Sequence, residues 1–198
     1  MRRVIAVGVA LLVSLAGALP AGAETEEGIQ VHGHWKIEIL EPDGTLVSVM
    51  EFENALVDPS AWSYLAKLLS AVASSGGYLV YLENDPGVGP CNDDLSDPIS
   101  CHIAEAGSLW PVSPHSSNLL ITATGTTVVL AGSVTADNSE PVSVVGTRGK
   151  VCTVSYSPLV CRGESMALVE DFTRATLPSP VPIDAGQIIQ VTVTISFS

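Results

Sequence analysis

Positive charge is scarce in this sequence. Of the 198 residues only eight are Lys or Arg, against 21 Asp or Glu, and the formal net charge is −13. A chain of this charge is repelled by the phosphates of nucleic acids and by anionic lipid headgroups. We therefore expect no nucleic-acid partner and no attachment to an anionic membrane surface.

The sequence has only one long apolar run, and this run lies at its start. Residues 4–19 carry no charge, follow two arginines, and end at Pro20 and the small residues 21–23. This order is typical of a secretory signal peptide. The run is short for a retained membrane span, which needs about 20 residues. We expect cleavage between Ala23 and Glu24.

If residues 1–23 are removed on export, residues 24–198 form the mature protein. They are long enough for a single domain with a hydrophobic core, and their six basic and 21 acidic residues give a net charge of −15. They contain no second run of spanning length, no cysteine close to the apolar run and no sorting tail at the end. We expect a soluble protein without stable membrane insertion, secreted to the exterior or held in a periplasm.

The four cysteines all lie in this exported part, at Cys91, Cys101, Cys152 and Cys161. An even number of cysteines in an exported chain indicates disulfides, and four cysteines allow three pairings. We favour Cys91–Cys101 and Cys152–Cys161, because each pair closes a short local loop. A metal site is a poor alternative, since neither pair has the CxxC spacing.

Alternation of apolar and polar residues dominates the mature sequence. Between residues 29 and 40 the apolar face consists of Val31, Gly33, Trp35, Ile37 and Ile39. A turn over residues 41–44 and a second run over 46–52 complete a β-hairpin. Further strands are predicted over residues 78–82, 119–124, 126–136, 142–151, 166–175 and 187–197, rich in Val, Thr and Ser.

A helix is predicted after the hairpin. Asp58 can cap it, Pro59 suits its first turn, and Gly76-Gly77 is expected to end it. Residues 83–117, rich in Asp, Pro, Gly and Ser, form a long irregular stretch. The pattern predicts a mainly β fold, an antiparallel β-sandwich or jelly roll with one short helix after the first hairpin.

Signatures of catalysis are absent from the sequence. Residues 163–165 lack the second glycine of a nucleophile elbow, and there is no phosphate-binding glycine loop or dinucleotide motif. We therefore expect that the protein is not an enzyme.

Two groups of residues could bind metal. His32 and His34 lie two apart in a predicted strand and so share a face, and His102 and His115 would complete the ligand set. The carboxylates of Asp93, Asp94 and Asp97, with Asn92 and Asp85 nearby, would suit calcium. In both cases a solvated polar surface is the simpler interpretation, so no cofactor is required and calcium is the candidate ion.

The order of motifs resembles that of a known group of proteins. Residues 35–69 comprise a Trp-led strand, an Asp43-Gly44 turn, a return strand ending in Phe52-Glu53-Asn54, and a helix. Residues 178–197 end the chain with Gly186-Gln187 before a Val/Thr/Ile strand. Together these segments, under half of the mature chain, resemble phage tail-associated and virion-type β-sandwich proteins and their secreted bacterial relatives. The resemblance implies a role in display, attachment or assembly.

The leading hypothesis is a secreted, non-catalytic structural or adhesive protein, a subunit of an extracellular filament assembled by terminal-strand exchange. Residues 24–31 would act as a donor strand, and an ordinary monomer is the alternative. The side chains expected to take part in assembly are Ile29, Val31, Val191, Val193 and Ile195.

Two further hypotheses belong to different classes. The protein could be a binding module for carbohydrate or another surface ligand, with Trp110 as the main contact and Tyr78, Tyr81 and Tyr156 as secondary ones. It could also be a metal-dependent enzyme centred on His32 and His34. Its partners would then be a surface ligand or a substrate instead of a second copy.

The cleavage site can be tested directly. Mass spectrometry of the protein exported by a producing cell should find Glu24 as its first residue. Substitution of Ala23 by Arg should block cleavage, because a signal peptidase requires a small residue at this position. An exported protein that retains residues 1–23 would contradict the prediction.

Overall fold

The computed structural model describes residues 30–54, 60–69, 73–84, 100–104, 118–152, 156–157, 160–161 and 168–198. The expected signal peptide lies outside these ranges. The elements are β1 (Val31–Leu40), β2 (Leu46–Asn54), α1 (Ser60–Leu69), β3 (Ser74–Glu83), β4 (Ser100–Ala104), β5 (Leu120–Thr124), β6 (Thr127–Thr135), β7 (Val142–Cys152), β8 (Leu168–Val181) and β9 (Ile188–Phe197).

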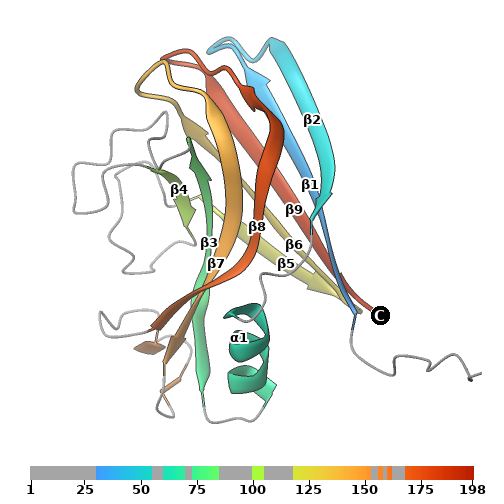
Figure 1. Cartoon of the computed structure of the whole chain (residues 1–198). Helices are drawn as coiled ribbons and strands as arrows, with labels where there is room; N and C mark the ends of the chain where they lie inside the picture. The colour runs from blue at the N-terminus through green and yellow to red at the C-terminus, as the bar shows by residue number, and fades with distance from the viewer. Residues whose placement is uncertain are drawn as a thin grey trace, which may run out of the picture.

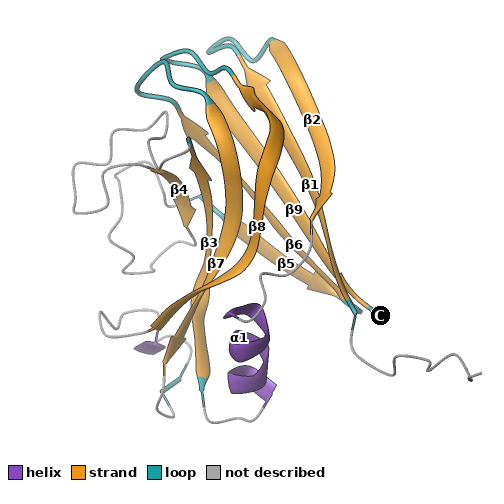
Figure 2. Cartoon of the chain, in the orientation of Figure 1, coloured by secondary structure: helices purple, strands orange, loops and turns teal. Residues whose placement is uncertain are grey.

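These strands form two antiparallel sheets that face each other (Figure 1). Sheet A has the order β2-β1-β9-β6-β5, and sheet B has the order β4-β3-β7-β8. The helix α1 lies at the lower end of the sandwich as drawn in Figure 2, beside the lower part of sheet B. The predicted mainly β fold, with a short helix after the first hairpin, is confirmed.

Consecutive strands pair in a simple way. The hairpins β1–β2 and β5–β6 belong to sheet A, and the hairpins β3–β4 and β7–β8 belong to sheet B. The last strand, β9, then enters sheet A between β1 and β6. β9 therefore joins the hairpins β1–β2 and β5–β6, which do not pair with each other directly.

One hydrophobic core fills the space between the sheets. The predicted face of β1 points into it, with Trp35, Ile37 and Ile39 buried. The Trp35 ring stacks on Phe52 of β2, with ring centroids 5.9 Å apart. Alternate residues of β9 meet these side chains from the same sheet, and Val80 and Leu82 meet them from sheet B. The alternation seen in the sequence thus marks the inner face of the sandwich.

The turn between β1 and β2 forms as its residues predict. The backbone N–H of Thr45 donates to the Asp43 carboxylate at 2.9 Å. A hydrogen bond from the Thr45 side chain, and then this backbone bond, lower the pKa of Asp43. Gly44 has a φ of 86°, which favours glycine.

The predicted end of the helix is wrong. Gly76 and Gly77 lie within β3, where a register shift between Ser75 and Gly77 interrupts the ladder with β7. A Cβ at Gly76 would lie 3.0 Å from the Cys161 sulfur and from a Lys150 carbon, so the close packing favours glycine there. Gly77 has a φ of 113°. These glycines therefore serve a bulge in a strand.

Strand β4 was not predicted, since it lies in the stretch expected to be irregular. It pairs with β3 from Leu79↔Ala104 to Glu83↔Ser100. Its Cys101 and Ile103 side chains are fully buried. The residues around it are rich in Asp, Pro, Gly and Ser, so the pairing with β3 and not the local pattern defines this strand. Among the described residues, no helix is long and apolar enough to cross a membrane.

The position of β9 gives a first stability prediction. Ile195 is 1% exposed, and its neighbour Thr194 lies on the outer face of the same strand. Ile195→Ala should lower the free energy of unfolding by about 2–5 kcal/mol, because it leaves a cavity in the core. Thr194→Ala should cost below about 1 kcal/mol. Urea unfolding measures both, and equal effects would contradict the placement of β9.

Candidate functional site

The sandwich has four edge strands among those described: β2 and β5 in sheet A, and β4 and β8 in sheet B. Proteins protect such edges with short strands, prolines or charges. Strands β4 and β5 are five residues long, and β8 carries Pro178 and Pro180 near its end. Strand β2 has nine residues, no proline and no basic residue. It is the longest edge without prolines.

Strand β2 also exposes large apolar side chains. Leu46, Val47 and Val49 are 52%, 51% and 46% exposed. A register shift between Ile39 and Leu40 pairs Leu40 with Leu46 and leaves Val47 as an extra residue. The regular part of the ladder therefore runs from Ser48 to Asn54. An apolar edge of this length is a surface on which another strand can add.

A groove with a volume of about 260 Å³ lies beside β2, between this strand of sheet A and the end of β8 in sheet B. Residues 47–50 of β2 form one wall and residues 179–182, at the end of β8, form the other, with Ile37 and Ile39 between them. Only two of the lining side chains, Ser48 and Ser179, are polar. The groove thus suits aliphatic side chains.

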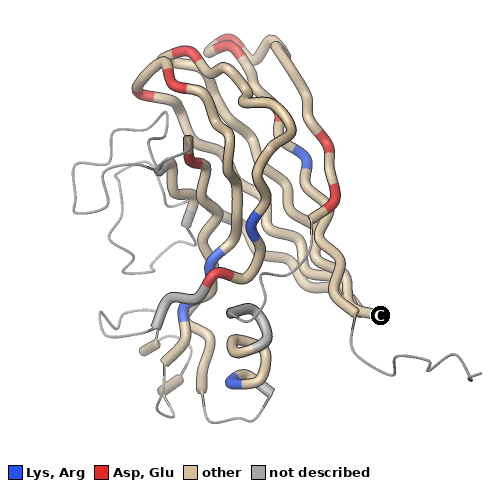
Figure 3. The backbone as a smooth tube through the Cα atoms, in the orientation of Figure 1, with Lys and Arg blue, Asp and Glu red and all other residues tan. Residues whose placement is uncertain are grey.

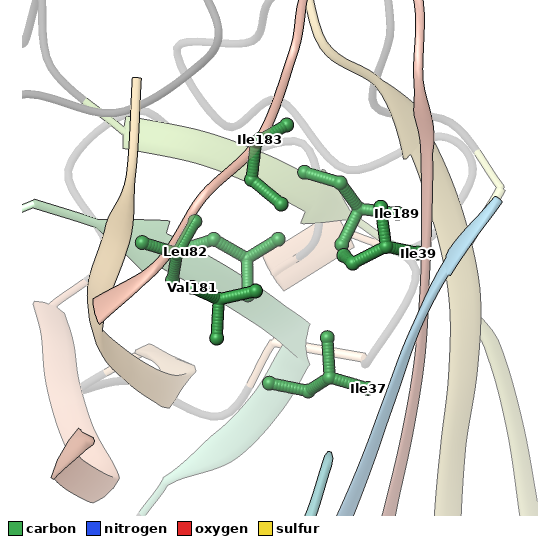
Figure 4. Close-up of a pocket in the computed structure, with 7 residues that line it drawn as sticks. Ile37, Ile39, Leu82, Val181, Ile183 and Ile189 are labelled. Atoms are coloured by element: carbon green, nitrogen blue, oxygen red, sulfur yellow. The ribbon is translucent and has the colours of Figure 1, made fainter. Parts of the chain in front are cut away.

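The groove continues a smaller gap in the core. Ile37, Ile39 and Val181 contribute to both, and the gap is otherwise lined by Leu82, Val142, Ile183 and Ile189 (Figure 4). This inner gap has no room for a water molecule and no polar lining group. The sheets are therefore closed behind the groove, and its opening is at β2.

The other half of β2 is acidic. Glu51 and Glu53 are exposed on its outer face, opposite Lys36 and His34 of β1. His34 Nδ1 lies 2.8 Å from Glu53 Oε1. Figure 3 shows acidic segments along β2 and at the loop end of the sandwich. The edge thus consists of an apolar half followed by an acidic half.

Lys36 is the basic residue of this surface. Its Nζ lies 2.9 Å from Glu38 Oε1, and Glu51 is its partner across the ladder. The hydrogen bond to Glu38, helped by the charges of Glu38 and Glu51, raises the pKa of Lys36. Two carboxylates, those of Glu38 and Glu51, therefore lie beside one lysine, and the outer face around β2 remains acidic.

The expected metal ligands are separated. His32 and His34 lie on the outer face of sheet A, whereas His102 is buried in β4 of sheet B, opposite Tyr81. Within the described ranges, no group of three His, Cys, Asp or Glu residues could hold a metal ion. His115 and the calcium candidates Asp93, Asp94 and Asp97 lie outside those ranges. A centre that combines His32, His34 and His102 is therefore wrong.

A second polar cluster occupies the outer face of sheet B. Arg148 of β7 donates from Nε to Asp171 Oδ1 of β8 at 2.7 Å, and its Nη2 lies 3.7 Å from Glu83 Oε1 of β3. The guanidinium also covers the Tyr81 ring, with Cζ 4.3 Å from the centroid. A Cβ on Gly146 would lie 2.3 Å from that ring. The cluster therefore holds three strands together.

The electrostatics of this cluster favour a structural role. Burial, and then the charge of Asp171, raise the pKa of Tyr81 to about 12. Burial opposes the charge of Arg148, but the hydrogen bond to Asp171 and the charges around it raise its pKa overall. Tyr81 is thus neutral and Arg148 charged at any physiological pH. Neither is suited to exchange protons with a substrate.

The remaining expected residues have mixed outcomes. The Cys152–Cys161 disulfide is confirmed, and Cys101 is also disulfide-bonded; its expected partner Cys91 and the ligand candidate Trp110 lie outside the described residues. Tyr81 is fully buried and Tyr78 half-buried, so Tyr156 is the exposed one of the three tyrosines. Val191, Val193 and Ile195 are buried in the core of the chain's own sandwich, and Val31 pairs with Phe197. Ile29 lies outside the described residues.

No family model, curated protein or solved structure matches this chain.

The sequence interpretation missed the edge of β2 as a site. A signal was present, because Val47 and Val49 place apolar residues on the face where a half-buried strand usually carries polar ones. The second signal was the lack of proline and lysine in that strand. Both become meaningful only when the strand is known to lie at an edge.

Tyr81 and Tyr64 offer a matched pair of variants. Both are fully buried. The Tyr81 hydroxyl has no hydrogen-bond partner among the described residues, whereas the Tyr64 hydroxyl lies 3.3 Å from Ser75 Oγ. Tyr81→Phe should leave the unfolding free energy at pH 7 unchanged or raise it by up to about 1 kcal/mol. Tyr64→Phe should lower it by about 0.5–1.5 kcal/mol.

The raised pKa of Tyr81 also predicts a pH dependence. A pKa that rises on folding contributes stability that is complete below the unfolded value, near 10, and is lost as the pH passes the folded value of about 12. Wild-type protein should therefore lose stability from pH 10 to 12, and Tyr81→Phe should lose less. Unfolding curves across this range measure it, and identical losses would refute the assignment.

Proposed function

We propose that this chain is a secreted, non-catalytic structural or adhesive protein that joins other polypeptides by β-strand addition at β2. The observation that carries the proposal is the open edge of β2, with Val47 and Val49 exposed beside an apolar groove. Secretion is supported by the signal-like residues 1–23. The virion-type resemblance agrees with a role in attachment or assembly.

Strand addition uses two kinds of contact. The outer edge of β2 offers backbone N–H and C=O groups to an incoming strand, and these hydrogen bonds supply affinity. Alternate side chains of that strand would point toward the groove between β2 and residues 179–182 of β8. Burial of aliphatic groups there adds about 25 cal/mol per Å² of apolar surface. The main chain and the groove therefore act on the same partner.

Addition at β2 is favoured over exchange of the C-terminal strand. Strand β9 has neighbours on both sides, and Val191, Val193 and Ile195 fill the core. Its release would expose those side chains and break two ladders. An addition at the edge of β2 breaks no hydrogen bond of the sandwich.

The proposal predicts that a charge on the edge blocks assembly. Protein recovered from the medium or surface of producing cells should be found in complexes larger than a monomer. Val49→Lys should reduce these complexes, since a lysine on an edge strand opposes strand addition. Native size measurement by light scattering tests this.

Leu120→Lys is the matched control. Leu120 lies on β5, the other edge of sheet A, and is 67% exposed. Its substitution should leave the complexes intact. Complexes that survive Val49→Lys, or that both substitutions reduce equally, would show that β2 is not the site of attachment.

A further inference from the structure

We infer that the strand received by β2 belongs to a different polypeptide and alternates apolar with basic residues. The inference rests on the proposed function and specifies the chemistry of its partner. Three features of the chain support it: the charge of the edge, the consequence of pairing with a second copy, and the places of its own basic residues.

The charge of the edge selects for basic residues. Beyond its apolar half, β2 displays Glu51 and Glu53 on the outer face, both exposed. A strand that pairs along Ser48–Asn54 places side chains directly opposite these carboxylates. Opposite charges at such cross-strand positions stabilise a ladder, and like charges destabilise it. The complementary strand therefore carries Lys or Arg near the acidic half.

Strand β2 of a second copy of the chain does not carry the basic residues that would complement this edge. Glu51 is the middle residue of the regular stretch Ser48–Asn54. A twofold antiparallel pairing of two such stretches would place Glu51 opposite its own counterpart, and Val49 opposite Glu53. The acidic residues thus act against edge-to-edge pairing of identical chains, which is how charged residues protect edge strands.

The other strands of the chain do not provide a basic partner for β2 either. Among the described strands, β1 and β7 carry basic or histidine side chains at alternate positions, namely His34 with Lys36, and Arg148 with Lys150. Both strands already have neighbours on each side. Upstream of β1, residues 24–29 include Glu24, Glu26 and Glu27, which would face β2 with like charge. A basic strand must therefore come from elsewhere.

The groove defines the other half of the partner. Its lining is aliphatic apart from Ser48 and Ser179. Side chains that point inward from the added strand are consequently apolar, while those that point outward near Glu51 are basic. A segment of alternating apolar and Lys or Arg residues meets both requirements.

A charge swap within the protein itself provides a probe of this chemistry. The swapped variant combines Lys36→Glu with Glu51→Lys, so the attractive pair across β1 and β2 is kept in reverse order. Its β2 then presents a basic residue at the centre of the edge. Wild-type and swapped proteins should form a heterodimer when mixed, while each alone remains monomeric. Sedimentation velocity at low salt measures this.

Charge should control the affinity of that heterodimer. Replacement of wild-type protein by Glu51→Gln should weaken it roughly 2- to 5-fold, the effect of losing opposite charges at one cross-strand site in a low-salt buffer. High salt should weaken the wild-type complex to a similar degree. Val49→Glu in the wild-type partner should weaken it further, because position 49 would then face Glu53 of the swapped protein with like charge, and Leu120→Glu should not.

Peptides keep the test valid if the swapped variant fails to fold. One probe copies residues 46–54 with lysine in place of both glutamates, and the other has the native sequence. The lysine peptide should bind the wild-type protein about 10-fold more tightly, with amide shifts concentrated on β2 in NMR spectra. Equal binding by both peptides would overturn the inference.

Other outcomes distinguish the inference from the proposed function. Wild-type protein that associates with itself through β2 would overturn the basic partner but leave strand addition in place. Loss of that association on deletion of residues 24–29 would identify the chain's own N-terminal segment as the donor. Absence of binding in every mixture would overturn the inference, and the complexes recovered from cells would then decide the proposed function independently.

Discussion

The structure depends on the insertion of β9 between β1 and β6. This strand pairs along its whole length with Val31–Leu40 on one side and with Thr127–Thr135 on the other. Its inward side chains, Ile189 to Ile195, complete the core of sheet A. Without it, the hairpins β1–β2 and β5–β6 would be separate two-stranded pieces, which are marginal in water. The sheet is therefore one unit because of its last strand.

In sheet A the backbone N–H and C=O groups that have no strand partner lie on the two outermost strands. Strand β9 satisfies both of its edges, and β1 and β6 satisfy theirs, so the unpaired groups of sheet A fall on β2 and β5. The short β5 exposes few of them, and β2 exposes many beside apolar side chains. In the proposed strand addition, the acidic residues Glu51 and Glu53 would limit which chains can pair with that edge. The same nine residues of β2 would then serve both interaction and protection.

Local structure was largely predictable from the sequence. The buried face of β1, the Asp43 turn and the Cys152–Cys161 pair follow from alternation, turn chemistry and short cysteine spacing. Strand order was not predictable, because pairings such as Val31↔Phe197 join strands that are far apart in the sequence. The Arg148–Asp171 bond and the edge position of β2 both depend on that order. The prediction of a helix end at Gly76 and Gly77 was wrong because glycine is favoured both in a β-bulge and at the end of a helix.

The reciprocal bonds between Gln30 and Ser198 have a consequence for the time course of folding. The backbone N–H of each residue donates to the C=O of the other, at 2.9 and 3.0 Å. Contacts so distant in sequence slow folding, since the whole intervening chain must be brought to order before they form. During synthesis β1 would wait for this partner until residues 188–197 have emerged. The hairpins β1–β2 and β5–β6 therefore join into sheet A only once β9 has been made, and the molecule is most vulnerable to aggregation before that.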